Sequence, residues 1–227
     1  MVAMDKALLE PVEQSKLRES VYAALSAAFT RGAFAPGDTL SLRALADQLG
    51  TSITPVREAV RRLVAEGGLI DTPTRKLQVP PFDRARLDDL LRARIALEPM
   101  LAQLAVARMD AATVEALEAI LAEPPQAPGQ PDLEQNHRFH FTLYRQSGSP
   151  VILPVVEGLW LQYGPHLRLM IEGADPEIGR GNDIHREILD AVRRGDAEGA
   201  AAGIERDICR SFALIPAPTA EAGAENA

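Results

Sequence analysis

The chain has 227 residues and a formal net charge of −8, and its 46% hydrophobic but only 4% aromatic content suits helices better than sandwiches or barrels. A single cysteine, Cys209, excludes an intrachain disulfide framework and favours the reducing cytoplasm. No apolar run approaches the roughly 18–20 residues that a membrane span needs, and acidic residues near the N-terminus exclude a signal peptide, so no membrane partner is expected.

The charge is distributed unevenly along the chain. Residues 16–79 hold nine Lys/Arg against six Asp/Glu, whereas residues 80–227 hold fourteen against twenty-three. The overall negative charge argues against a nucleic-acid binder, but a basic front on an acidic body is typical of a modular DNA-binding protein. Because the acidic body repels phosphate, the basic part must make the contact with DNA.

Proline-rich runs divide the chain. Val79-Pro80-Pro81 favours an extended linker, and residues 123–131 carry four prolines that exclude a helix there. The division predicts four segments: a flexible arm over 1–15, a DNA-binding domain over 16–79, an effector-binding and dimerisation domain over 80–215, and a disordered tail over 216–227.

The elements expected before the linker follow the plan of a winged helix-turn-helix. Apolar residues at helical spacing predict a first helix up to about Arg31 and a short second helix that stops at Gly50. Thr54 is predicted as the N-cap of a third helix with a clear apolar stripe. Two short extended runs, residues 69–72 and 77–79, predict the β-ribbon called the wing.

The remainder of the chain is predicted to be entirely helical. The expected helices cover 84–108, 111–122, 133–146, 151–171, 176–194 and 197–215. The predicted fold class is therefore mainly α, with a winged helix-turn-helix followed by an all-α antiparallel bundle of about six helices.

The third helix carries the candidate DNA-reading residues. Thr54, Arg57 and Arg61 fall in one narrow sector of a helical wheel, opposite the apolar stripe. Arginines on such a face suit the major groove, where they bind guanine or phosphate, although taken as a pair they could equally be solvated surface residues. Three further cations are candidates for holding the flanking DNA backbone: Arg43, Arg75 and Lys76.

Three runs of residues, 34–40, 45–50 and 52–63, resemble the GntR family of bacterial regulators. The most specific part is Thr-Pro-Val-Arg-Glu-Ala, residues 54–59. The resemblance covers about residues 16–79, and the helical remainder is similar to the FadR-type (FCD) effector domain of that family.

The resemblance implies particular DNA contacts, namely Arg43, Thr54 and Arg57. The chain departs from the family at Ile53, where arginine is frequent, and at Lys76, where glycine is frequent at the wing tip. Both departures concern the operator sequence rather than DNA binding itself.

Four residues of the helical part form a candidate metal site. Asn136 and His140 stand four residues apart on one predicted helix, and His185 and Asp207 lie on two later helices that a bundle can bring to the same interior point. Two imidazoles and a carboxylate suit Zn²⁺, Ni²⁺, Mn²⁺ or Fe²⁺ with open positions for a ligand. Spacing alone leaves open the alternative that both histidines are hydrogen-bonded core residues.

The resemblance to the FCD domain favours the metal site. That domain commonly has Asp or Asn four residues before the histidine of a Phe-His pair and then two more histidines. Asn136, Phe139-His140 and His185 follow this pattern. The last family histidine aligns with Asp207, so metal affinity and preference can differ from those of the family.

The candidate effector-binding residues surround this site. Arg94 matches a family arginine that faces the effector pocket, and a guanidinium beside a metal suits a carboxylate ligand. A salt bridge to Glu98 is an open alternative. Trp160, Tyr163 and Arg168 either line the pocket or belong to the core or a dimer surface.

The resemblance implies a cytoplasmic homodimer that binds two half-sites of double-stranded operator DNA and acts as a repressor released by a small organic acid. A metal-dependent enzyme with a two-His-one-Asp site is the alternative, and a DNA-binding protein without any ligand is another. No general base or nucleophile stands out beyond the metal ligands, so we expect no enzymatic activity.

Overall fold

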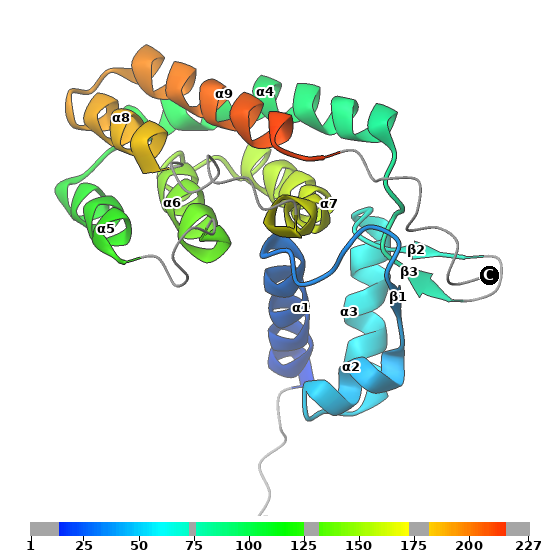
Figure 1. The fold of residues 1–227 in the computed structure, drawn as a ribbon. Coiled ribbons are helices and arrows are strands. Elements are labelled where there is room, and N and C mark those ends of the chain that lie inside the picture. Colours follow the sequence, from blue (N-terminus) through cyan, green and yellow to red (C-terminus); the bar gives the residue numbers. More distant parts are fainter. Residues whose placement is uncertain (1–13, 73–75, 125–131, 173–181, 217–227) are drawn as a thin grey trace, which may run out of the picture.

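The computed structural model describes residues 14–72, 76–124, 132–172 and 182–216 (Figure 1). The predicted arm over 1–15 and tail over 216–227 lie almost wholly outside the described residues, and the predicted domain boundaries stay predictions. The elements follow in this order: α1 (Gln14–Thr30), β1 (Thr39–Leu40), α2 (Leu42–Gln48), α3 (Ile53–Ala65), β2 (Ile70–Asp71), β3 (Leu77–Gln78), α4 (Arg84–Val106), α5 (Ala111–Ala122), α6 (Leu133–Arg145), α7 (Ile152–Glu172), α8 (Asn182–Arg193) and α9 (Ala197–Ala213).

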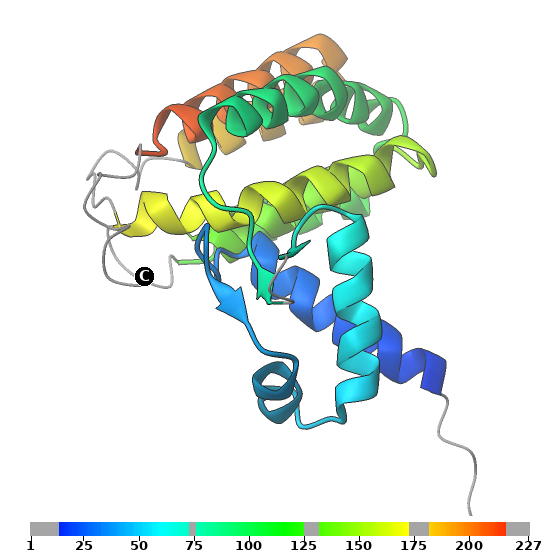
Figure 2. The same cartoon turned by 90° about the vertical axis from the view of Figure 1, so that its right-hand side faces the viewer.

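The elements before the linker form the predicted winged helix-turn-helix. β3 lies between β1 and β2 and pairs antiparallel with both, with Leu40 opposite Leu77 and Ile70 opposite Gln78. In both views α2 and the beginning of α3 form the end of the molecule most distant from the helical bundle (Figures 1 and 2). This end is therefore open to a large partner.

The third helix begins earlier than predicted. Ser52, in an extended conformation, occupies the N-cap position and Thr54 lies inside the first turn, so the assignment of Thr54 as N-cap is wrong. Ser and Thr are both good N-cap residues, so the start of the helix was ambiguous in the sequence. The helix ends at a glycine in the left-handed conformation. Gly67 has φ +76°, and the Gly68 N–H donates to the Leu63 carbonyl at 2.9 Å.

The apolar stripe of α3 packs against α1, as its periodicity predicts. Val56 and Leu63 are fully buried beside Phe29 of α1. Burying one face of so short a helix fixes which face stays in solvent. That outer face is the one with the candidate DNA-reading residues.

The second part is the predicted all-helical bundle. α4 packs on α9 and α7, α8 packs on α9, and α5 packs on α6 and α8. The helix limits in the structure agree with the predicted ones to within two residues, except that residues 173–181, where the fifth helix was predicted to begin, lie outside the described residues. None of the described helices is both long enough and apolar enough to cross a membrane.

Helix α7 joins the two parts, since it packs on α1 while its other side belongs to the bundle (Figure 2). Leu161 of α7 is buried in the core of the N-terminal part. The Gln162 amide donates to the Glu66 carbonyl at 2.9 Å and accepts from Arg86 at 2.6 Å. Gly164 brings the two backbones together, because a Cβ added there would lie 2.1 Å from the Phe29 carbonyl oxygen.

We expect Gly164→Ala to destabilise the protein by about 1–3 kcal/mol, because the added methyl meets backbone that cannot rotate away. Gly158→Ala on the same helix is the control. Beyond the backbone of its own turn, no atom that the structure describes lies within 4 Å of its added Cβ, so the helix preference of alanine should stabilise the protein by about 0.5–1 kcal/mol. Urea unfolding measures both values, and equal stability of the two variants would show that the α1–α7 contact is looser than described.

Candidate nucleic-acid interface and buried metal cluster

The outer face of α3 presents three of the predicted DNA-reading residues to solvent. Thr54, Arg57 and Arg61 are all exposed, while Val56 and Val60 between them are buried. A helix held by its apolar side with its polar side free is the geometry that major-groove recognition needs. The three residues therefore share one accessible surface, and their DNA contacts stay predictions.

A groove of about 740 Å³ runs between α3 and the wing. Among its lining residues one acid, Asp71, faces four cations: Arg43, Arg57, Arg61 and Lys76. Arg61 pairs with Glu58 at 3.0 Å, whereas no ion pair joins Arg43 or Arg57 to any other residue that the structure describes. Arg75, predicted at the wing tip, lies outside the described residues.

A neighbouring arginine of α3, Arg62, makes its contacts with the protein itself. Arg62 pairs with Glu66 at 2.8 Å and its guanidinium lies 3.6 Å from the centre of the Tyr22 ring on α1. This arginine ties α3 to α1 and points away from the groove residues. It is therefore a matched control for the candidate DNA contacts.

Inside the bundle, three helices bring His140, His185 and Asp207 together as predicted, with one ligand atom from each within 4.8 Å of the others. His140 Nε2 lies 3.1 Å from Asp207 Oδ2 and 3.3 Å from His185 Nε2. His185 Nε2 lies 3.6 Å from Asp207 Oδ1. Both histidines are buried, so the cluster is consistent with a metal site in the bundle interior.

The electrostatics of the cluster favour a neutral His140 imidazole beside an ionised Asp207 carboxylate. Burial lowers the pKa of His140 by more than its hydrogen bond with Asp207 raises it. Burial raises the pKa of Asp207, but hydrogen bonds with His140 and His185 outweigh this effect and hold the pKa below its usual range. Imidazole nitrogens and a carboxylate are ligand atoms that transition metals prefer, so a divalent cation fits this donor set.

Asn136, the fourth predicted ligand, lies one turn before His140 on α6 and is half-buried. An amide oxygen is a weaker partner for a transition metal than imidazole. Its role as a ligand stays a prediction.

Arg94 of α4 lies in the same interior, with 2% of its surface exposed. The salt bridge named above as an alternative does form: Arg94 Nε donates to Glu98 Oε1 at 2.5 Å and Nη2 to Oε2 at 3.2 Å. The guanidinium is also flanked by the Trp160 and Tyr163 rings, 4.3 and 4.4 Å from their centres. Arg94 Nη1 and Trp160 Nε1 have no hydrogen-bond partner among the described residues, so this spot offers two buried donors.

Burial raises the pKa of Tyr163 to about 12, so its hydroxyl group is neutral at physiological pH. Arg168, the remaining predicted effector residue, is exposed on α7, and its backbone N lies 3.2 Å from the position of a Cβ at Gly32. It differs in this from Trp160 and Tyr163, which are buried. All these assignments to an effector stay predictions.

Sequence reasoning missed Tyr144 as part of the site. Its hydroxyl donates to Glu98 Oε2 at 2.8 Å and lies 3.1 Å from His140 Nδ1, so it connects the arginine to the metal cluster. The signal was present, since Tyr144 follows His140 by four residues and therefore shares its helix face.

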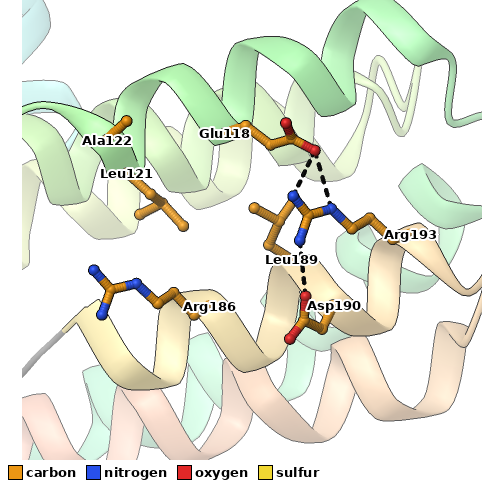
Figure 3. Close-up of a pocket in the computed structure, with 7 residues that line it drawn as sticks. All are labelled: Glu118, Leu121, Ala122, Arg186, Leu189, Asp190 and Arg193. Atoms are coloured by element: carbon orange, nitrogen blue, oxygen red, sulfur yellow. Dashed lines mark hydrogen bonds and ion pairs between the residues drawn. The ribbon is translucent and has the colours of Figure 1, made fainter.

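A second groove, of about 400 Å³, lies between α5 and α8 (Figure 3). Its Arg193 donates to Glu118 at 2.6 Å and to Asp190 at 2.9 Å, as the dashed lines show. Arg186 in the same groove pairs with Asp183 at 3.4 Å. These charged side chains pair with one another at the surface, so the groove is a weaker candidate for a ligand site than the buried cluster.

A winged helix-turn-helix with a cationic groove, fused to a helical bundle with a buried His-His-Asp cluster, defines a DNA-binding transcriptional regulator of two parts. Residues 17–75 match the bacterial regulatory proteins of the gntR family, and residues 89–208 match the FCD domain. The chain belongs to the GntR family and has an FCD domain of the FadR type.

Its relatives agree with this assignment. The HTH-type transcriptional regulator McbR of Escherichia coli is 35% identical over 189 residues, which cover 81% of this chain and 86% of McbR. A putative L-lactate dehydrogenase operon regulatory protein of E. coli is 31% identical over 184 residues, 70% of each chain. The solved structure of E. coli McbR/YncC superimposes with a TM-score of 0.81 at 32% identity, covering 88% of this chain and 96% of that one. These relatives are described as transcriptional regulators and not as enzymes, so they give the alternative of a metal-dependent enzyme no support.

Proposed function

We propose that this protein is a cytoplasmic, homodimeric repressor that leaves its operator when a small organic acid binds beside a divalent metal in the bundle. The observation that carries the proposal is the buried Arg94, with an unpartnered Nη1, connected through Glu98 and Tyr144 to the His140 cluster. A metal and a guanidinium together suit a carboxylate.

The charges near the cluster support an anionic ligand. Glu98 and Asp207 contribute two negative charges and Arg94 one positive charge when both histidines are neutral. A divalent metal would turn this balance from one negative to one positive charge. A monocarboxylate would then restore neutrality in a buried region, where uncompensated charge is costly.

Helix α7 is the proposed route from ligand to DNA. Trp160 and Tyr163 contact Arg94, whereas Leu161 and Gly164 on the same turn contact the winged helix-turn-helix. A ligand that shifts the first pair must shift the second. In a dimer this would alter the spacing of two recognition helices, and repression would change only by the ligand's differential affinity for the two arrangements.

Thermal unfolding of the full-length protein tests the sensor part. We expect Zn²⁺ or Ni²⁺ at a hundred times its dissociation constant to stabilise the protein by about 2.7 kcal/mol, roughly 5–10 °C, and EDTA to remove the effect. Acetate, L-lactate, succinate and citrate then serve as probes of the carboxylate site, L-lactate being suggested by the name of the second relative.

His185→Ala is the matched variant, because it removes one ligand of the cluster from a different helix than Arg94. It should show no metal-dependent shift and no further shift with any acid. Size-exclusion chromatography with light scattering tests the dimer. A wild-type protein without any response to metal, chelator or acid would overturn the sensor proposal and leave a DNA-binding protein that is indifferent to ligand.

A further inference from the structure

A continuous chain of hydrogen bonds joins α4 to the metal cluster. Arg94 donates twice to Glu98, Tyr144 donates to Glu98 Oε2 at 2.8 Å, and the Tyr144 oxygen lies 3.1 Å from His140 Nδ1. Arg94, Glu98, His140 and Tyr144 are all buried, so water does not compete for these bonds. The order of donors and acceptors along the chain is therefore determined by the side chains themselves.

Counting protons fixes the direction of the last bond. Tyr144 has one hydroxyl proton, and it is used on Glu98, whose carboxylate oxygens can only accept. The Tyr144 oxygen is then an acceptor, so His140 Nδ1 must be the donor. A neutral imidazole has one N–H, so with Nδ1 donating to Tyr144 the Nε2 lone pair faces Asp207 Oδ2 at 3.1 Å, and a cation bound between these two atoms would relieve their repulsion.

We propose that Glu98 and Tyr144 are positioning residues that hold His140 with its proton on Nδ1 and its Nε2 available to a metal. This inference rests on the metal-containing pocket proposed above. His185 provides an internal contrast, because its Nδ1 is buried with no hydrogen-bond partner among the described residues. The two ligand histidines are thus held unequally, and an anion that draws Arg94 away from Glu98 changes the support of His140 first.

Tyr144→Phe tests the inference, because it removes one hydroxyl and preserves the ring. Outer partners of ligand histidines commonly change metal affinity by about 10–100-fold, and we expect a loss of that size for Zn²⁺ in competition with a chromophoric chelator. Tyr22→Phe is the control, since it removes another Tyr–Glu hydrogen bond, between α1 and α3, and should leave zinc affinity unchanged.

Nitrogen-15 spectra of histidine-labelled, metal-free protein report which ring nitrogen carries the proton, a property that a simple loss of stability does not change. His140, assigned by its loss in His140→Asn, should be protonated at Nδ1 in the wild type and should lose this preference in Tyr144→Phe. A wild-type His140 protonated at Nε2, or equal zinc affinity in Tyr144→Phe, overturns the inference. A wild type that has the Nδ1 tautomer but binds no metal supports the positioning and contradicts the proposed metal site instead.

A separate observation concerns the first residue of α3. Ile53 is one of the few large apolar side chains that are strongly exposed among the described residues, with 40% of its surface accessible, and it lines the same groove as Arg57. Packing does not require isoleucine at this position. N-terminal residues of a recognition helix face base edges, and an apolar side chain there recognises the thymine methyl group.

The geometry points to Ile53 as a reader of thymine in the operator. Burying one methyl group is worth about a fourfold change in affinity. This role requires no effector and no metal, so it is independent of the sensor proposals.

An operator is first selected from a random duplex library, and each thymine is then replaced by deoxyuridine, which lacks only the methyl group. At one position of each half-site we expect the wild type to lose about fourfold in affinity and Ile53→Ala to lose nothing. Val151→Ala, which changes another exposed aliphatic residue far along the chain, should keep the wild-type dependence. The assignment is overturned if no such replacement changes the operator affinity of the wild type, or if the affinity of the Ile53→Ala protein falls by the same factor.

Discussion

Arg57→Ala is expected to weaken operator binding by about 30-fold to about 10⁴-fold. One arginine contact to a base is worth about 1–3 kcal/mol, and the proposed homodimer would lose two of them, which gives about 2–6 kcal/mol. Arg57 is exposed in the groove and has no ion pair with any other described residue, so no carboxylate in that part of the chain competes with DNA for its guanidinium. Fluorescence anisotropy with a labelled operator at fixed salt measures the change.

The same substitution should leave the fold intact, because Arg57 is exposed and forms no ion pair with another residue that the structure describes. Arg62→Ala, five residues along the same helix, is the reverse case. It breaks the contacts with Glu66 and Tyr22, so it should lower stability and leave the preference for operator over random DNA unchanged. If Arg57→Ala bound operator as tightly as the wild type, the outer face of α3 would not be the reading surface.

Periodicity predicted α3 well because burial of one face dominates the energetics of a short helix. Val56 and Leu63 are buried and Arg57 and Arg61 exposed, as the wheel requires. The start of the helix was misplaced because Ser52 and Thr54 are both good N-caps, and a difference in capping free energy of a few tenths of a kcal/mol cannot be read from composition.

The convergence of His140, His185 and Asp207 required more than spacing. A meeting of residues from three helices can be predicted only when the order of the helices around the bundle is known. The resemblance to the FCD domain supplied that order. Glu98 was predicted only as an alternative salt-bridge partner of Arg94. Its second partner, Tyr144, follows from tertiary packing of α4 against α6, which no local pattern encodes.

Gly164 shows a different limit of sequence reasoning. Its importance depends on the Phe29 carbonyl that lies opposite, 135 residues earlier in the chain. A Cβ added at Gly158, six residues earlier on the same helix, would lie within 4 Å of no atom in the described part of the neighbouring elements. The two glycines are equivalent in sequence and become distinguishable only when the neighbouring helix is in place.

Glu98→Ala is expected to destabilise the protein by about 3–5 kcal/mol, a large part of the 5–15 kcal/mol that typically separates folded and unfolded states. The carboxylate is fully buried and Arg94 is 2% exposed, so removing Glu98 leaves a guanidinium in the interior without its counter-charge. Urea unfolding of the metal-free protein measures the loss without any contribution from a ligand.

Glu118→Ala is the matched control, because it removes the same kind of partner from an exposed arginine, Arg193 (Figure 3). Both side chains of that pair are more than 40% exposed, and exposed pairs contribute about 0–1 kcal/mol. A double variant, Arg94→Met with Glu98→Leu, separates the cost of an unpaired buried charge from the cost of lost packing. Replacing a buried ion pair by apolar groups of similar volume is commonly neutral for stability. If Glu98→Ala cost no more than Glu118→Ala, water would have to reach Arg94, and the interior would be a solvated cavity in which a carboxylate gains little from that guanidinium.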